Sequence, residues 1–305
     1  MSLKRRWVWA LRIGLALASL AVALLALELY LRRDTPREEE KFLGPAPDGV
    51  DVPYALRPDT DVVFEGKTVK IAPTHVRISA QGLREDKVYT VPKPAGQKRL
   101  LCFGDSFVFG WGVELEDTFV KRFEARLGGK LEAINFGVPG YNTTHAVELL
   151  EKRGLILQPD GVLVFLSDND LYEKGADRLD ERREQGEDWA VERYVKSRTK
   201  RKQKAESAYE RDPTTVRRKL LAALDRLRAV CERAGIPYRV VLLFPNPMEG
   251  FIRDVIAGKE PLMFDDYLKD IRKYQIPGDM HPNALGHDHI AGRLYEVLGE
   301  WARQL

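Results

Sequence analysis

The stretch Leu100-Leu101-Cys102-Phe103-Gly104-Asp105-Ser106-Phe107 decides the fold prediction for this chain. Its apolar residues run without a break, a glycine ends the run, and a serine follows two positions later. A short apolar run that stops at a glycine predicts a buried strand and a tight turn before a helix. Open α/β folds bind their ligands at the carboxyl edge of the sheet, where we expect Ser106 to lie. Taken alone, a helix N-cap is the better interpretation of Ser106.

Three further apolar runs have the character of buried strands, and helical patterns lie between the runs. Strands of this length that alternate with helices predict right-handed βαβ units and a parallel sheet covered on both faces. The predicted fold class is therefore α/β, a three-layer α/β/α sandwich. The expected strands are residues 99–103, 131–136, 161–166 and 238–244, and the expected helices are residues 117–127, 144–157, 213–234 and 284–305.

The amino terminus has the features of a membrane anchor. An apolar segment fills residues 7–31 and is interrupted only by Arg12 and Glu28. If these two charges reach the interfaces, the segment provides the roughly 20 residues that a bilayer needs. The basic run Lys4-Arg5-Arg6 predicts that the amino terminus lies inside and the rest of the chain outside. We expect residues 1–33 to be one transmembrane signal anchor, with a cleaved signal peptide as the alternative.

Two segments are expected between the anchor and the main domain. Residues 34–58 are charged and then rich in proline and glycine, which predicts a tether without much structure of its own. Residues 59–97, here called the preface, predict a small β-rich segment packed on the main domain. Within it we expect a hairpin between residues 61–64 and 68–71, and another strand at residues 75–78.

The main domain is expected over residues 98–305, with a charged insertion at residues 173–211. The insertion has few apolar residues at regular spacing, which favours a solvated, partly helical excursion. The alternative is a lid or a polymer-contacting insertion, because the segment leaves directly from the loop that carries Asn169.

Charge and cysteine content limit the classes of partner. The formal net charge is +3, from 49 basic and 46 acidic residues, and no basic stripe is interleaved with aromatic residues. We therefore predict no nucleic-acid partner. Cys102 and Cys231 lack a metal-type spacing, so we expect two small buried hydrophobes, or a disulfide if the protein is exported.

Three polar stretches follow the Gly-Asp-Ser stretch along the chain. They are Asn135-Phe136-Gly137-Val138-Pro139-Gly140, Ser167-Asp168-Asn169-Asp170 and Asp279-Met280-His281-Pro282-Asn283. In this order the four stretches resemble the sequence blocks of the SGNH (also called GDSL) hydrolase family, over about residues 98–300. The resemblance implies the flavodoxin-like SGNH fold and a serine esterase or acyltransferase without a metal or an organic cofactor.

A serine hydrolase needs a nucleophile, a base, a group that orients the base, and donors for the oxyanion. Ser106 is the nucleophile candidate, and its own backbone N–H is one donor candidate. His281 is the base candidate and Asp279 the orienting candidate, because residues two apart in an irregular loop can turn toward one another. Many family members have Asp-x-x-His in this block, with the aspartate three residues before the histidine. In this chain Gly278 occupies the position of that aspartate. The Asp-x-His form resembles membrane-tethered members that act on envelope or exported polysaccharides.

The remaining oxyanion donors follow from the resemblance. Five residues after Asn135 comes Gly140, which the family pattern makes the backbone donor, with Gly137 a close second. Asn169 is the expected side-chain donor, or else a turn former after a strand. Ser167 stands where that block normally has glycine.

The combined expectation is an enzyme of the bacterial cell membrane with its catalytic domain outside the cytoplasm, in the periplasm. Its substrate would be an acylated carbohydrate or another small ester, and an O-acetyl group is the preferred acyl group. Two alternatives stay open, an inactive glycan-binding or envelope-complex scaffold, and a lipase or thioesterase. The latter would need an apolar acyl channel. The oligomeric state is not predicted.

Two other interpretations, an α/β-hydrolase and a metal site, are less favoured. An α/β-hydrolase would have Gly-x-Ser-x-Gly, but Val108 occupies the last position. A metal site is conceivable, but histidines two apart in a helix point in different directions. That site would take its ligands from His281, His287, His289 and either Asp279 or Asp288.

Overall fold

The computed structural model describes residues 3–32, 38–65, 71–129, 131–167, 170, 213–243 and 270–305. The chain divides into two units, and each is described by itself. Helix α1 (Leu3–Arg32) represents the first unit, and the other described residues belong to the second. The predicted insertion at residues 173–211 lies outside the described residues.

Helix α1 is the one described helix that is long and apolar enough to cross a membrane. The apolar part runs from Trp7 to Leu27, and none of it is buried inside the protein. A signal sequence has the same length and composition, so the helix fits either a membrane span or a signal sequence.

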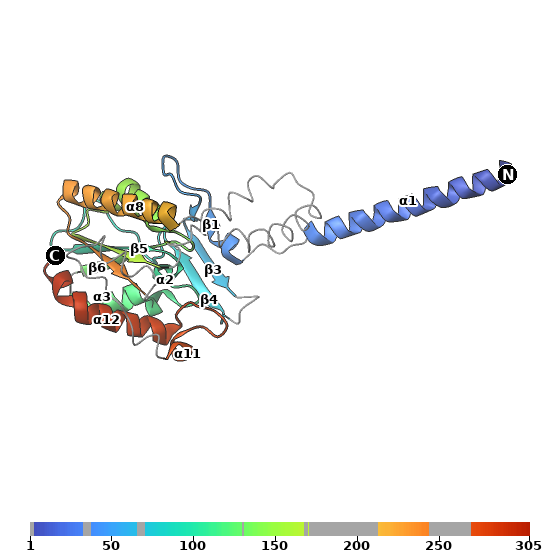
Figure 1. Ribbon diagram of the computed structural model, residues 1–305. Coiled ribbons are helices and arrows are strands. Elements are labelled where there is room, and N and C mark those ends of the chain that lie inside the picture. Colours follow the sequence, from blue (N-terminus) through green and yellow to red (C-terminus); the bar gives the residue numbers. More distant parts are fainter. Residues whose placement is uncertain are drawn as a thin grey trace. The chain divides into compact units, whose positions relative to one another are not determined.

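A parallel sheet forms the centre of the second unit, with the strand order β6-β5-β7-β8 (Figure 1). The chain leaves β5 on one side to form β6 and returns on the other side to form β7. Strand order therefore reverses beside β5, and ligands bind at such a switch point in open α/β sheets. The strands are β5 (Lys98–Gly104), β6 (Leu131–Gly137), β7 (Gly161–Leu166) and β8 (Tyr238–Leu242).

Helices cover both faces of the sheet, which confirms the predicted three-layer α/β/α class (Figure 1). Leu100 and Cys102 of β5 pack in the cluster that contains α3 and α12. Leu101 and Phe103 point the other way and pack in the cluster that contains α4 and α8. Strand β7 (Gly161–Leu166) is buried along its whole length, so its sequence is a continuous apolar run rather than an alternating one. The helices are α3 (Phe119–Leu127), α4 (Thr143–Leu149), α8 (Pro213–Ala234) and α12 (Ala284–Arg303).

Short helical elements complete the second unit. Helix α4 continues into a π-helical turn and a 3-10 turn, so the expected helix at residues 144–157 changes its winding along its length. The short elements are η1 (Glu38–Lys41), α2 (Ser106–Phe109), η2 (Leu115–Asp117), η3 (Leu150–Gly154), η4 (Leu155–Leu157) and α11 (Ile271–Tyr274).

The preface contains an antiparallel pair, β3 (Thr60–Phe64) and β4 (Thr74–Ile78). The register places Phe64 opposite Thr74, so the partner of residues 61–64 is not the expected segment 68–71. Val76 and Ile78 of β4 are buried together with Phe64, and this pairing puts the buried side chains of both strands into one core.

The expectation of an unstructured tether is wrong for residues 42–58. Phe42 is fully buried, and Tyr54 and Leu56 are 5% and 3% exposed. They join the core cluster on the α4 side of the sheet, and β1 (Leu43–Gly44) pairs with β2 (Ala55–Leu56). The prolines and glycines of this segment shape turns between apolar residues that dock on the domain.

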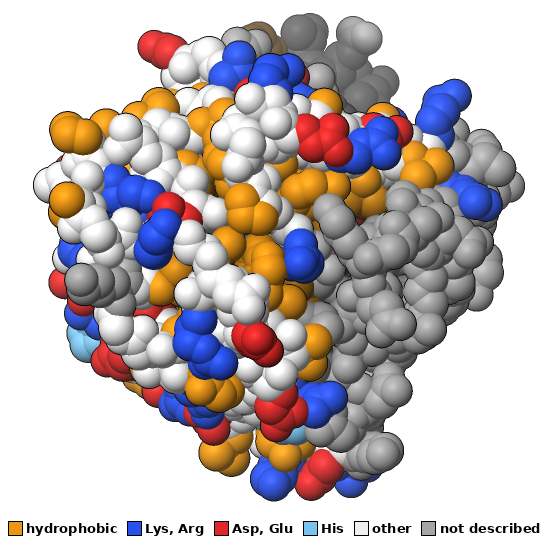
Figure 2. Space-filling model, turned by 90° about the vertical axis from the view of Figure 1, so that its left-hand side faces the viewer, with side chains coloured by type: hydrophobic (Ala, Val, Ile, Leu, Met, Phe, Trp, Pro, Cys, Tyr) orange, Lys and Arg blue, Asp and Glu red, His pale blue; other side chains and the backbone are white. Residues whose placement is uncertain are grey.

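Surface charges of both signs are interspersed. Figure 2 shows blue and red side chains alternating over the displayed face, with hydrophobic atoms between them. Several charges form cross-element pairs, such as Lys87 with Glu132 at 2.8 Å and Arg77 with Glu116 at 2.9 Å. This pattern agrees with the near-zero net charge of the sequence.

Candidate active site

Ser106 is the first residue of α2, directly after β5. The N-cap of this helix is Asp105, whose side chain accepts a 2.9 Å hydrogen bond from the N–H of Phe107. The alternative role of Ser106 as the cap is therefore wrong. The side chain of Ser106 is left for other partners at the carboxyl edge of the sheet.

Two glycines, Gly104 at the end of β5 and Gly137 at the end of β6, allow α2 to pack directly on the strand ends. A Cβ atom at Gly104 would lie 2.4 Å from the Val108 side chain, and one at Gly137 would lie 2.2 Å from the backbone nitrogen of Phe109. The Asn135 side chain adds a 2.7 Å hydrogen bond to the carbonyl of Val108. Any larger residue at either glycine would displace α2.

His281 lies in an irregular turn between α11 and α12. The N–H of Ile276 donates to the His281 carbonyl at 2.9 Å, and the N–H of Asp279 donates to the Ile276 carbonyl at 2.9 Å. Gly278 has a φ of 81°, which favours glycine. Asn283 caps α12 through its side chain. This turn directs the two side chains of Asp279 and His281 toward one another.

The structure brings Ser106, His281 and Asp279 together. The Nε2 atom of His281 lies 2.7 Å from the Oγ atom of Ser106, and its Nδ1 atom lies 2.5 Å from Oδ1 of Asp279. Partial burial acts to raise the pKa of Asp279, but the hydrogen bond from His281 and its charge outweigh burial and hold that pKa below its usual value. An ionised Asp279 accepts the Nδ1–H and leaves Nε2 to accept the Ser106 hydroxyl.

Two aromatic rings flank the imidazole. The ring centroid of Phe107 lies 5.0 Å from that of His281, and the centroid of Trp111 lies 5.6 Å from it. Both rings are tilted by about 35° or less against the imidazole plane. The imidazole is thus held by a carboxylate at one nitrogen and by apolar rings beside it.

The three backbone amides expected as oxyanion donors differ in their hydrogen bonds. Within the described part of the chain, the N–H groups of Ser106 and Gly140 donate no hydrogen bond. The N–H of Gly137 donates to the Asn135 side chain at 2.9 Å, which leaves Gly140 as the better candidate. Asn169, the expected side-chain donor, lies outside the described residues.

A buried carboxylate that the sequence analysis did not single out connects the end of β7 to the start of α4. Asp170 accepts hydrogen bonds from the Thr143 N–H at 2.6 Å, the Thr143 hydroxyl at 2.5 Å and the Ser167 N–H at 2.9 Å. Burial raises the pKa of Asp170 to about 6 and also raises the pKa of Asp105. The Asn-Asp pair in the third stretch was the available signal for Asp170.

The two other histidines of the metal alternative have packing roles. Nδ1 of His287 accepts the N–H of Phe119 at 3.1 Å, and the two rings stack at 5.6 Å. Burial lowers the pKa of His287 to about 3, so the ring is neutral. His289 packs on Tyr274 at 4.8 Å. Among the described residues, no three metal-ligating side chains cluster.

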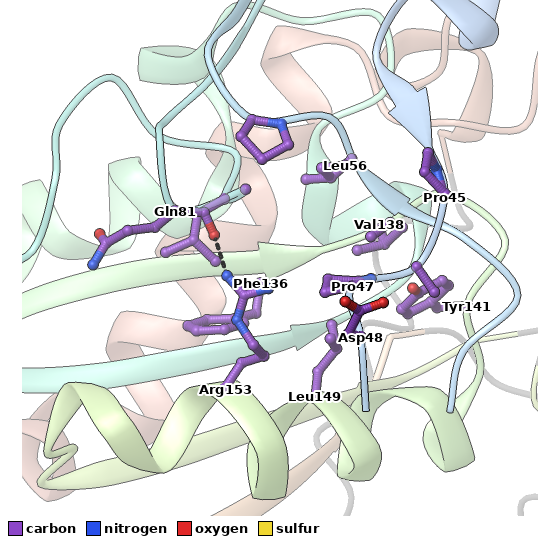
Figure 3. A pocket seen from close by; sticks show the side chains of 15 residues that line it. Pro45, Pro47, Asp48, Leu56, Gln81, Phe136, Val138, Tyr141, Leu149 and Arg153 are labelled. Atoms are coloured by element: carbon purple, nitrogen blue, oxygen red, sulfur yellow. Dashed lines mark hydrogen bonds between the residues drawn. The ribbon is translucent and has the colours of Figure 1, made fainter. Parts of the chain in front are cut away.

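A separate pocket of about 370 Å³ lies between residues 45–58, the turn at residues 81–83, and the β6 and α4 region (Figure 3). Its walls are mostly apolar, and Arg153 at its side donates a 2.8 Å hydrogen bond to the Gln81 carbonyl. Ser106, His281 and Asp279 are not among its lining residues. The labelled lining residues are Pro45, Pro47, Asp48, Leu56, Gln81, Phe136, Val138, Tyr141, Leu149 and Arg153.

Solved structures that resemble this chain are hydrolases of low sequence identity. A member of the lipolytic protein G-D-S-L family from Veillonella parvula is 16% identical, with 66% of this chain and 97% of that chain covered and a TM-score of 0.43. The psychrotrophic esterase EstA from Pseudoalteromonas sp. is 15% identical, with 67% and 98% covered and a TM-score of 0.45. The acetyl xylan esterase AlAXEase is 16% identical, with 66% and 99% covered and a TM-score of 0.43.

No curated protein matches the sequence. The family comparison is more direct, because residues 102–289 match the GDSL-like Lipase/Acylhydrolase family. The matched segment begins in β5, four residues before Ser106, and ends in α12 just after the His281 turn. It therefore contains the Gly-Asp-Ser part of the first stretch and the other three stretches in full. The chain therefore belongs to the GDSL-like lipase/acylhydrolase family, a family of hydrolases.

Proposed function

We propose that the protein is a serine esterase or acyltransferase that works through an acyl-enzyme on Ser106. The observation that carries the proposal is one continuous hydrogen-bonded chain from the Ser106 hydroxyl through both nitrogens of His281 to Asp279. In a member of a hydrolase family, this chain has the atoms and the order that serine-dependent acyl transfer requires.

In the first half of the reaction, the Oγ atom of Ser106 attacks the ester carbonyl carbon while Nε2 of His281 takes the hydroxyl proton. The resulting imidazolium is stabilised by the Asp279 carboxylate. When the tetrahedral intermediate collapses, His281 gives the proton to the leaving alcohol oxygen, and the acyl group stays on Ser106.

In the second half, a water molecule or a second alcohol attacks the acyl carbon. His281 takes the proton of the attacking hydroxyl and returns it to Oγ of Ser106 as the acyl bond breaks. Water as the acceptor gives hydrolysis, and a sugar hydroxyl gives transfer of the acyl group.

The negative charge on the intermediate requires fixed donors. We assign this role to the backbone N–H groups of Ser106 and Gly140 and to the side-chain amide of Asn169. The two amides are supported by having no hydrogen-bond acceptor within the described residues. Asn169 is proposed from its place in the third stretch.

We further propose that the acyl group is small, as in an O-acetyl group on a carbohydrate of the cell envelope. The Asp-x-His form of the last stretch and the apolar amino-terminal helix support this assignment. The basic residues before that helix would keep the amino terminus in the cytoplasm and place the second unit on the periplasmic side of the membrane. The 370 Å³ pocket is not proposed as an acyl channel, because its lining lacks the three candidate catalytic residues.

A substrate panel tests the proposal on the full-length protein in detergent. Acetylated sugars and esters with longer acyl chains are offered to the wild type and to Ser106→Ala. We expect turnover of acetyl esters that falls with acyl length and that Ser106→Ala abolishes. Equal turnover by both proteins would contradict the mechanism. No turnover on any ester would instead favour a glycan-binding scaffold, and preference for long chains would favour a lipase or thioesterase.

A further inference from the structure

We propose that Trp111 is a positioning residue for His281, and that the preface together with Phe42 holds Trp111 in place. The inference rests on the proposed function, because it gives the segment before β5 a part in the reaction assigned to Ser106 and His281. Trp111 lies inside the segment that matches the family, whereas the side chains proposed to hold it come before position 102, where that match begins.

The first contact route consists of aromatic rings. The indole of Trp111 lies 5.6 Å from the His281 ring. The same indole meets the ring of Phe64 edge-on at 4.5 Å and the ring of Phe42 at 6.4 Å. Aromatic rings favour such edge-to-face contacts over a stacked sandwich. Trp111 thus connects the imidazole to two buried side chains that precede the main domain in the sequence.

The second route passes through the backbone beside Trp111. A Cβ atom at Gly112 would lie 2.6 Å from the side chain of Ile276 and 3.1 Å from that of Ile71. Ile276 belongs to the His281 turn, where its N–H donates to the His281 carbonyl. Gly112 therefore lies in close contact with both the preface and the turn that carries His281.

A buried arginine of the preface fixes the loop that contains Trp111 and Gly112. Arg84 is fully buried, and its guanidinium donates to the carbonyls of His75 at 3.0 Å, Arg77 at 3.1 Å and Val113 at 3.3 Å. It also lies 5.2 Å from the ring centre of Phe109 in α2. One cation therefore links β4, the loop after α2, and α2 itself.

These contacts bear on the orientation of the imidazole. Asp279 and Ser106 bond the two ring nitrogens of His281, but these bonds leave the ring free to tilt about the line that joins the two nitrogens. The indole of Trp111 and the ring of Phe107 limit this tilt and keep Nε2 directed at Ser106. A misplacement of about 1 Å between reacting groups costs roughly a hundredfold in rate. Loss of the indole is therefore expected to slow the chemical step rather than to weaken substrate binding.

Four variants of the full-length protein in detergent test this inference, with 4-nitrophenyl acetate as the substrate and a fluorophosphonate as the covalent probe. They are Trp111→Ala, Trp111→Phe, Phe64→Ala and the control Val76→Ala. Val76 is buried in the same preface core but is not part of the ring contacts. Each rate is expressed per folded molecule, from an unfolding curve recorded for every variant.

We expect Trp111→Ala to lower both kcat and the labelling rate by about 10- to 100-fold, with KM within about twofold of the wild type. Trp111→Phe should restore most of the loss, and Phe64→Ala should lower kcat to an intermediate value. Val76→Ala should be less stable yet keep the wild-type kcat.

Three results would overturn the inference while leaving the proposed function intact. They are a wild-type kcat in Trp111→Ala, a raised KM with unchanged kcat in that variant, and a wild-type kcat in Phe64→Ala. The second result would make Trp111 a substrate contact instead. A wild type that neither turns over the ester nor reacts with the probe would overturn the proposed function, and the inference with it.

Discussion

The Ser167 hydroxyl donates a 2.5 Å hydrogen bond to the Asp105 carboxylate, and this bond joins the carboxyl ends of β7 and β5. Asp105 also caps α2, the helix that begins with Ser106. Ser167 occupies the position where the third stretch of the family pattern has glycine. A residue that departs from the pattern therefore supports the helix of the candidate nucleophile.

Removing the hydrogen bond between Ser167 and Asp105 should lower the stability of the fold. Ser167→Ala removes the hydroxyl donor from a buried carboxylate, and the free energy of unfolding should fall by about 1–3 kcal/mol in urea denaturation. Ser79→Ala is the matched control, because the buried Ser79 hydroxyl has no hydrogen-bond partner in the described part of the chain. Its loss should change stability much less, and equal losses for the two variants would argue against this role of Ser167.

Substitution of Asp279 should lower the rate of catalysis with little change in structure. Asp279→Asn keeps the shape of the side chain but presents an amide to Nδ1 of His281, which disfavours the required tautomer. We expect kcat to fall on the order of 10²- to 10⁴-fold with a nearly unchanged KM. The control Asp288→Asn removes surface ion pairs to Arg122 and Arg126 and should leave kcat unchanged. Similar kcat values for Asp279→Asn and the wild type would show that Asp279 does not orient the base.

The proposed side-chain oxyanion donor is tested with two substitutions at one position. Asn169→Ala removes the amide, and Asn169→Asp replaces it with a group of the same shape that accepts rather than donates. Both should lower kcat by about a hundredfold or more, because one donor to the oxyanion is lost. Wild-type turnover in either variant would exclude Asn169 from the oxyanion site.

Burial of His287 should make the folding stability of the protein fall at acid pH. Burial lowers its pKa to about 3, against an ordinary value of 6.5, so the unfolded chain binds more protons than the folded chain between these pH values. The contribution of His287 to stability is present above pH 6.5 and is lost as the pH falls below it, by roughly 1.4 kcal/mol per pH unit. In urea titrations the stability gap between the wild type and His287→Gln should narrow from pH 7 to pH 4. A gap that does not depend on pH would contradict this assignment.

The layered fold was predictable because its signals are local. The strand at residues 161–166 and the helix at residues 213–234 have the predicted bounds, since a buried parallel strand and an amphipathic helix each show their pattern over a few residues. The docking of Phe42 and the pairing of β3 with β4 were not predicted. Both depend on contacts between distant segments, which a proline-rich or alternating sequence does not specify.

The site was predictable only through the order of its four stretches. Ser106 and His281 are 175 residues apart, and no local pattern requires them to meet. A parallel sheet places the loops after its strands at one edge, and this topology makes the convergence possible. Trp111, Arg84 and Ser167 were missed as contributors because their partners lie on other elements, and a Gly-Trp-Gly sequence alone is typical of any loop.

The most direct test of the account is site-resolved labelling of the full-length protein with a fluorophosphonate, read by peptide mass spectrometry. Nucleophilic attack on the phosphorus needs a serine activated by its histidine. We predict one adduct, on the peptide that contains Ser106, and its loss in both Ser106→Ala and His281→Ala, whereas Ser79→Ala still reacts. An adduct on another residue, or labelling of Ser106 at the wild-type rate in His281→Ala, would contradict the proposed relay.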